Sequence, residues 1–319
     1  MLATQTHKID VNGIRMHVVE SGSGPLAICC HGWPELGYSW RHQIPALADA
    51  GYRVVVPDMR GFGQTEAPAE ISQYSILHMV GDIVGLVRAL GEQEAVVIGH
   101  DWGAPVAWHC AMLRPDVFRK VIAMSVPHRA RGPAPPLTIL RKQGLHNYYW
   151  CYFQNPGVAE REFEGDVSTT LRKIVYGVSG EVPVDRENPL MVPENGGFLD
   201  RLRVPETLPA WIREEDLKVF VDEYRRTGFR GGLNWYRNID RNWELTAPWE
   251  EARIEQPALF IAGTRDPVIA GKRGAAAIEA MEKAVPKVQK VLIEKAGHWI
   301  QQERPNEVNQ AMLGFLRSG

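Results

Sequence analysis

The 319-residue chain has few cysteines, no long apolar run and almost no excess of charge of either sign. Its four cysteines, Cys29, Cys30, Cys110 and Cys151, are too few and too irregularly spaced for a disulfide framework or a zinc ligand set. No window approaches eighteen uncharged apolar residues, so no membrane-spanning helix is expected. We therefore expect reduced thiols, no metal and no cofactor, in a cytoplasmic globular protein.

The chain also lacks the features that mark export or binding to nucleic acid. Its first residues, MLATQTHKIDVNGIRMHVVE, contain no basic region followed by an apolar stretch of signal length. The net charge is −2 and the basic residues are scattered, so neither a nucleic acid nor an anionic membrane is an expected partner. These observations favour a small, uncharged or modestly polar ligand.

What the sequence does contain is a repeated alternation of short apolar runs and helical patterns. Asn12-Gly13 between two alternating runs predicts a β-hairpin at the start of the chain. Continuous apolar runs follow at 26–30, 53–57, 95–99 and 120–124, with amphipathic helical patterns between them. Buried strands alternating with helices predict an α/β fold, with a mostly parallel, doubly wound sheet that carries helices on both faces.

This alternation stops near residue 130 and returns after about residue 245. The intervening segment contains RGPAPP, the aromatic run NYYWCYFQNPG and charged helical stretches such as REEDLKVFVDEYRRTG, but no buried-strand runs. The strand pattern resumes at 258–263 and 288–293. We therefore predict a core made of residues 1–130 and 246–319, with an α-helical lid at 131–245 inserted between its two parts.

A carboxylate occupies the position where a strand-turn-helix pattern of this kind usually carries a serine. Gly99-His100-Asp101-Trp102-Gly103 has the spacing of a nucleophile elbow, in which a tight turn lifts the central side chain out of the sheet edge. A carboxylate is already ionised near neutral pH and can attack carbon without a base. The resulting ester must then be hydrolysed by water, and that water needs a base.

The second half of the sheet offers both a base and an acid to orient it. His298 follows the apolar run at 288–293, and Asp266 lies four residues beyond the apolar run ALFIA. The order nucleophile, acid, histidine is the one expected for this elbow, and open α/β sheets bind ligands at this edge. We therefore predict Asp101, Asp266 and His298 as a catalytic set.

Six motifs along the chain form a family pattern: HGWPE at 31–35, the stretch at 38–63, GHDWGAPVAW at 99–108, YFQNPGVAE at 152–160, TGFRGGLNWYRNIDRNWELTAPW at 227–249 and GHWIQQERP at 297–305. Through these motifs the chain resembles, over nearly its whole length, the α/β-hydrolase fold and within it the soluble epoxide hydrolases. The resemblance implies a cofactor-independent hydrolase that converts an epoxide and water to a vicinal diol through an ester on Asp101.

The leaving group separates epoxide opening from dehalogenation, because an alkoxide needs a proton and a halide does not. Phenols above the nucleophile therefore favour an epoxide. The resemblance assigns two such tyrosines, Tyr152 and Tyr236. The residues alone do not separate Tyr152 from Tyr148 or Tyr149, which we expect to pack the lid.

The resemblance also implies backbone donors for the oxyanion formed during ester hydrolysis. These are the N–H groups of Trp33 and Trp102. Glu35, in the same motif as Trp33, is expected to position the hydrolytic water for His298.

The sequence leaves two other functions open and disfavours a third. A haloalkane or haloacid dehalogenase would use the same Asp-His-Asp set, and a non-catalytic binder of small molecules could share the fold. A nucleotide-binding oxidoreductase is disfavoured, because Gly61-x-Gly63 is followed by Glu66 where a third glycine is needed. We expect a monomer or a homodimer with a small-molecule epoxide as its partner.

Overall fold

A single eight-stranded sheet forms the centre of the protein, with strand order β1-β2-β4-β3-β5-β6-β7-β8. The computed structural model describes residues 4–182 and 190–318. The strands are β1 Gln5–Val11, β2 Ile14–Ser21, β3 Leu26–Cys30, β4 Arg53–Pro57, β5 Ala95–His100, β6 Phe118–Met124, β7 Ala258–Gly263 and β8 Val288–Ile293. All neighbouring pairs from β4 to β8 are parallel, and β2 is antiparallel to both of its neighbours. The predicted α/β fold with a mostly parallel sheet is confirmed.

The predicted hairpin joins β1 to β2. Val11 pairs with Ile14, and the two residues between them, Asn12 and Gly13, have φ angles of 46° and 78°. Positive φ at both central positions suits an Asn-Gly turn, and its twist matches that of the flanking strands.

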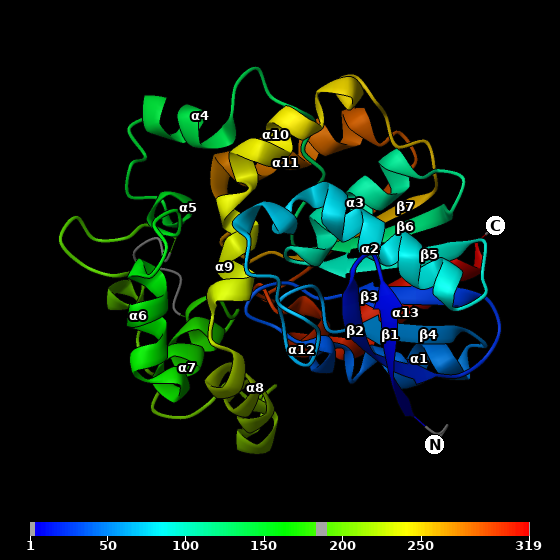
Figure 1. Ribbon diagram of the computed structural model, residues 1–319, viewed down its shortest axis with the longest axis horizontal. Coiled ribbons are helices and arrows are strands. Elements are labelled where there is room, and N and C mark those ends of the chain that lie inside the picture. Colours follow the sequence, from blue (N-terminus) through cyan, green and yellow to red (C-terminus); the bar gives the residue numbers. More distant parts are fainter. Residues whose placement is uncertain (1–3, 183–189, 319) are drawn as a thin grey trace.

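The two faces of the sheet are buried in separate apolar clusters. In β5, Val97 packs into one cluster and Ile98 into the other, and in β6 Val121 and Ile122 are divided in the same way. Helices α2 (Ile76–Ala89) and α3 (Gly103–Leu113) cover one face, while α1 (Gln43–Asp49) and α13 (Pro305–Arg317) cover the other (Figure 1). The central residues of strands buried on both sides are therefore apolar at consecutive positions, as the continuous runs in the sequence indicated.

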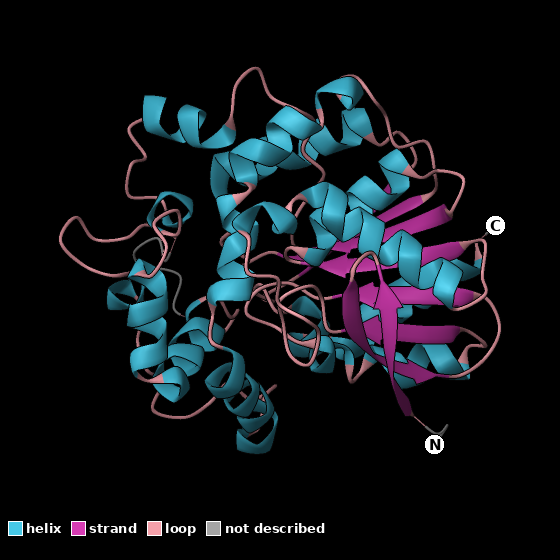
Figure 2. Cartoon of the chain, in the orientation of Figure 1, coloured by secondary structure: helices cyan, strands magenta, loops and turns pink. Residues whose placement is uncertain are grey.

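A group of helices lies between β6 and β7 in the chain and to one side of the sheet in space (Figure 2). We call these the cap helices: α4 Pro136–Lys142, α5 Tyr149–Tyr152, α6 Val158–Gly165, α7 Val167–Gly177, α8 Glu214–Thr227, α9 Arg230–Arg237 and α10 Ile239–Leu245. Strands β6 and β7 are neighbours in the sheet although the cap helices separate them in sequence. The cap helices therefore leave and rejoin the core at the same place.

The remaining elements complete the core and the connections. They are α11 Gly271–Ala284, α12 Ile300–Glu303 and the short 3-10 turns η1 Gly37–Trp40, η2 Ile71–Tyr74, η3 Phe198–Arg201 and η4 Ala247–Trp249. In the described part of the chain, no helix is long and apolar enough to cross a bilayer. The loops that follow β3, β5, β7 and β8 emerge on the side of the sheet where these parallel strands end, and they carry the predicted site residues of the core, while the two predicted tyrosines lie in the cap helices α5 and α9.

Candidate active site

Asp101 stands on a strained turn between β5 and α3. Its φ angle is 49°, a conformation that residues with a side chain rarely adopt. The flanking glycines are required, because a Cβ on Gly99 would lie 1.9 Å from the Gly103 carbonyl oxygen and one on Gly103 would lie 2.0 Å from the Cys30 carbonyl oxygen. The geometry is that of the predicted nucleophile elbow, and it raises the carboxylate above the strand ends.

A backbone donor meets this carboxylate from the loop after β3. The Trp33 N–H donates to Oδ1 of Asp101 at 2.6 Å. Trp102 immediately precedes α3, and the first N–H groups of a helix have no partner within that helix. The two predicted oxyanion donors thus lie on either side of the elbow, one contacting Asp101 directly.

His298 lies between the two predicted carboxylates. Its Nε2 is 3.3 Å from Oδ2 of Asp101, and its Nδ1 is 3.0 Å from Oδ2 of Asp266. The other oxygen of Asp266 accepts the Val268 N–H at 2.8 Å, which fixes the carboxylate. Burial alone would lower the pKa of His298, but the charges of Asp266 and Asp101 outweigh burial and raise this pKa well above its ordinary value.

The loop that carries His298 is tied to the end of cap helix α7. The His298 N–H donates to the Val178 carbonyl oxygen at 2.9 Å. Glu303, in α12, is 5% exposed and accepts three backbone N–H groups: Gly180 at 3.0 Å, Gly297 at 2.8 Å and Trp299 at 3.2 Å. One buried carboxylate therefore joins the residues on both sides of His298 to the cap.

We expect Glu303→Leu to lower the free energy of unfolding by about 2–5 kcal/mol, because three buried N–H groups lose their acceptor. It should also lower kcat, since the loop of His298 loses its support. Denaturant unfolding and steady-state kinetics measure the two effects. Glu303→Gln, which keeps a carbonyl oxygen, should lose less, and Glu307→Gln on the exposed first turn of α13 should change neither quantity. Unchanged stability and kcat in Glu303→Leu would contradict this role.

Glu35, in the loop after β3, contacts residues that are adjacent in sequence to Trp33 and Asp101. One of its oxygens accepts the Gly32 N–H at 3.1 Å and lies 2.6 Å from His100 Nδ1, while Gln301 donates to the other at 2.9 Å. Burial would raise the pKa of Glu35, but His100 outweighs it and lowers this pKa to about 2. His100 Nε2 in turn donates to the His298 carbonyl oxygen at 2.7 Å. Glu35 thus reaches the loop of His298 through His100, to which the sequence pattern assigned no role. Water positioning by Glu35 stays a prediction.

Two phenols lie near Asp101 in the wall of the adjoining cavity. Tyr236, in α9, is 2% exposed, and its ring centroid is 5.6 Å from that of Tyr149, in α5. Burial is the main cause of a pKa well above the ordinary value at both tyrosines, and the charge of Asp101 contributes at both. Both phenols therefore stay protonated beside the carboxylate.

The structure corrects the sequence interpretation of Tyr152. Its hydroxyl donates to Glu162 of α6 at 2.8 Å, and Tyr152 is not among the residues that line the cavity beside Asp101. Tyr149, which was expected only to pack the lid, occupies that place instead. The physical reason is local: α5 is a single turn that carries both phenols, and the carboxylate of Glu162 holds Tyr152 away from the cavity.

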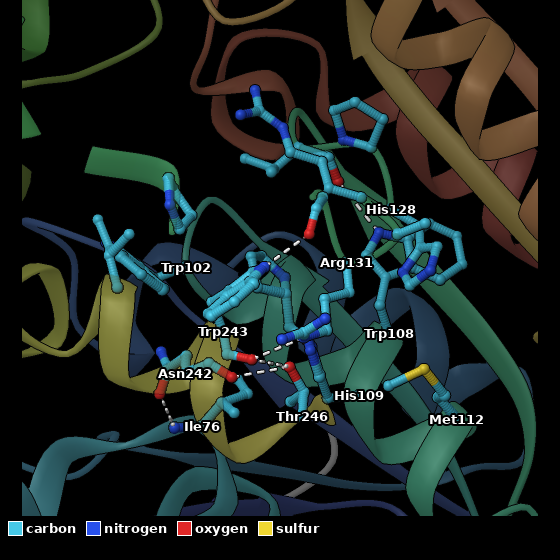
Figure 3. Close-up of a pocket in the computed structure, with 18 of the residues that line it drawn as sticks. Ile76, Trp102, Trp108, His109, Met112, His128, Arg131, Asn242, Trp243 and Thr246 are labelled. Carbon is cyan, nitrogen blue, oxygen red and sulfur yellow. Dashed lines mark hydrogen bonds between the residues drawn. The ribbon is translucent and has the colours of Figure 1, made fainter. Parts of the chain in front are cut away.

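The cavity that contains Asp101 has a volume of about 230 Å³ and is lined mainly by aromatic and apolar side chains. It lies between the core and the cap helices, and Figure 3 shows part of its wall, including Trp102, Trp108 and Trp243. Among the described residues, no group of three or more His, Cys, Asp or Glu side chains could hold a metal ion. Such a cavity suits an uncharged organic ligand.

Known proteins are similar to this chain in sequence. A family model for the alpha/beta hydrolase fold matches residues 25–166. Epoxide hydrolase A of Mycobacterium tuberculosis is 47% identical over 97% of this chain and 96% of its own length. Epoxide hydrolase 2 of Siraitia grosvenorii is 41% identical over 97% of each chain.

The similarity extends to solved structures. Epoxide hydrolase A from Mycobacterium thermoresistibile gives a TM-score of 0.93 at 44% identity and covers 99% of both chains. An epoxide hydrolase from Vigna radiata gives 0.91 at 38% identity and covers 100% of this chain and 98% of its own. The chain therefore belongs to the epoxide hydrolase family of the α/β-hydrolase fold.

Proposed function

We propose that this epoxide hydrolase opens its substrate by direct attack of Asp101 on an epoxide carbon. Oδ2 of Asp101 forms the new bond to carbon while the ring C–O bond breaks, and Oδ1 keeps its hydrogen bond from the Trp33 N–H. Tyr149 and Tyr236 supply the proton for the departing ring oxygen. The observation that carries this proposal is the pair of protonated phenols beside an ionisable carboxylate, because only an alkoxide leaving group needs them.

His298 acts in the second step. Once Asp101 is an ester it no longer carries a negative charge, so one of the two carboxylates that raise the pKa of His298 is lost. The pKa of His298 then falls, so the imidazolium gives up its proton, which restores the phenol that was deprotonated in the first step. The neutral imidazole can then take a proton from water, while Asp266 keeps it oriented. Hydroxide adds to the ester carbonyl carbon, and the Trp33 and Trp102 N–H groups bind the oxyanion. Collapse of this intermediate breaks the bond to the substrate oxygen, which takes the hydroxyl proton of the intermediate. The vicinal diol is released, and the Asp101 carboxylate and the protonated His298 are restored.

Single-turnover hydrolysis in heavy-oxygen water tests this sequence of steps. The oxygen of water should enter the Asp101 carboxylate in the first turnover, because it adds to the ester and not to the substrate carbon. Mass spectrometry of the peptide that contains Asp101 and of the diol locates the label. Label found only in the diol would contradict the ester route. Haloalkanes and fluoroacetate, assayed in parallel for halide release, should give none, which separates this function from dehalogenation.

We also propose domain boundaries, a cellular location, a partner and a state of assembly. We propose residues 1–130 and 246–319 as the catalytic core and 131–245 as the cap, supported by the pairing of β6 with β7. All four cysteines are free, which supports a cytoplasmic location with reduced thiols. The proposed partner is a small-molecule epoxide, and the proposed assembly is a monomer or homodimer.

A further inference from the structure

The cavity extends well beyond Asp101, along one face of α3. Residues at helical spacing line it: Trp102, Pro105, His109 and Met112. A rise of 1.5 Å per residue puts His109 about 10 Å farther along the helix axis than Trp102. Figure 3 shows Trp102 on one side of the view and His109 and Met112 on the other. A ligand that fills the cavity therefore has a distal end that the proposed chemistry does not use.

Two histidines meet at this distal end. His109 belongs to α3, and His128 lies in the segment that follows β6; their ring centroids are 6.5 Å apart. Both line the cavity, and His128 is only 3% exposed. Across residues 4–182 and 190–318, neither nitrogen of His128 has a hydrogen-bond partner. Its nitrogens are also not among the polar atoms that are sealed from solvent, so they are accessible from the cavity, where a ligand or water can satisfy them.

The protonation state of the pair follows from burial and one hydrogen bond. Burial lowers the pKa of His109, and burial followed by the neighbouring His109 lowers the pKa of His128 to about 3. Both shifts favour the neutral form of the two rings. His109 Nδ1 lies 2.7 Å from the Pro105 carbonyl oxygen, so Nδ1 carries the proton and Nε2 is an acceptor. His128 keeps one N–H donor and one acceptor.

The surroundings favour a neutral ligand group over an anion. Arg131, which also lines the cavity, is engaged by Glu250 at 3.1 Å and by the Trp243 carbonyl oxygen at 3.0 Å. Arg129 has no carboxylate partner in the described structure, but its guanidinium lies over Trp150, 5.7 Å from the ring centroid, and its charge acts on Tyr149 beside the nucleophile. The charge of Arg129, which no carboxylate of the described residues balances, therefore acts at the catalytic end, whereas the charge of Arg131 is balanced by Glu250.

We infer that His109 and His128 form a distal subsite that binds a hydroxyl group of the substrate. A hydroxyl can donate to His109 Nε2 and accept the N–H of His128 at the same time, and one oxygen with two hydrogen bonds of about 2.8 Å can bridge rings at this separation. The inference rests on the proposed function, because the epoxide must lie at Asp101 for the distal group to reach this pair. The substrate class is a hydroxylated epoxide whose two groups are about 10 Å apart.

A homologous series of terminal epoxyalkanes tests this subsite. The far end of each chain carries a methyl, a hydroxyl or a carboxylate group, and kcat/KM is measured at each chain length. At the length that spans the cavity, the hydroxyl series should exceed the methyl series by about three- to ten-fold, and shorter chains should show no difference. A preference for the carboxylate series would overturn the subsite in favour of charge recognition by an arginine of the cavity wall such as Arg131, and equal rates at every length would overturn it in favour of bound water alone.

Variants of His128 test whether this residue causes the preference for a hydroxyl group. His128→Phe should bring the hydroxyl-to-methyl ratio of kcat/KM to about one, and His128→Gln, which keeps an N–H and an acceptor, should retain most of it. His146→Gln, at an exposed histidine of the cap segment, should leave the ratio at its wild-type value. A ratio that persists in His128→Phe would contradict the subsite. If the wild-type protein opened no member of any series, the proposed function itself would be overturned, whereas equal opening of all three series would leave that function intact.

Discussion

Replacing both Tyr149 and Tyr236 by phenylalanine should abolish epoxide opening, while Tyr152→Phe should leave it close to the wild-type rate. The alkoxide released from an epoxide is roughly as basic as hydroxide, so opening without a proton donor is very slow. General acid catalysis typically contributes about 10²- to 10⁴-fold, so each single variant should lose up to that factor and the double variant should lose more than either. Rapid-quench measurement of substrate loss in a single turnover reports this step directly.

Tyr152→Phe is the matched control because it removes the same atom from the same helical turn. Its hydroxyl contacts Glu162 and not the cavity, so the loss should appear in stability and not in the opening rate. Melting temperatures of the four variants and of the wild-type protein separate a loss of stability from a loss of proton donation. The assignment fails if the double variant still opens epoxides, or if Tyr152→Phe is as slow as the Tyr149→Phe and Tyr236→Phe single variants.

His298→Gln should trap the enzyme as its ester. The first step needs Asp101 and the phenols, which this variant retains, but the second step loses the base that activates water. We expect product release to fall by about 10²- to 10⁴-fold while one equivalent of substrate is still consumed per active site. Intact-protein mass spectrometry should show a gain equal to the mass of one substrate molecule.

Asp101→Asn provides the counterpart, because its amide cannot form the ester and the protein mass should stay unchanged. A His298→Gln protein that releases diol without gaining mass would mean that water attacks the epoxide directly. Such a result would also remove the reason for the Asp101 elbow, since an aspartate acting only as a base does not need to contact carbon.

The positions of Asp101, Asp266 and His298 could be predicted because they depend on short-range features. Each follows a strand that the apolar pattern identifies, and the ends of parallel strands converge at one edge of a sheet. The glycines of the elbow add a second local signal, since they mark a turn with no room for side chains.

The choice between Tyr149 and Tyr152 could not be made from the sequence because it depends on a distant partner. Which phenol of a one-turn helix faces the cavity is set by Glu162, and nothing in the aromatic run YYWCY reveals that contact. The role of Glu303 is hidden for a similar reason: it accepts the N–H of Gly180, which lies 123 residues earlier in the chain. The sequence around His128 did not indicate a binding site either, because the environment of its ring is created by α3 and not by its own neighbours in sequence.

The attachment of the His298 loop to the end of α7 limits how this enzyme can diversify. Val178 and Gly180 belong to the segment after α7, yet they hold the backbone on which the imidazole is mounted. A cap transplanted from a relative would bring new walls to the cavity but would also have to rebuild that junction. Changes in ligand range are therefore tolerated most readily in α4 and α10. Helix α5 has to keep Tyr149, and the end of α7 has to match the core to which it is joined.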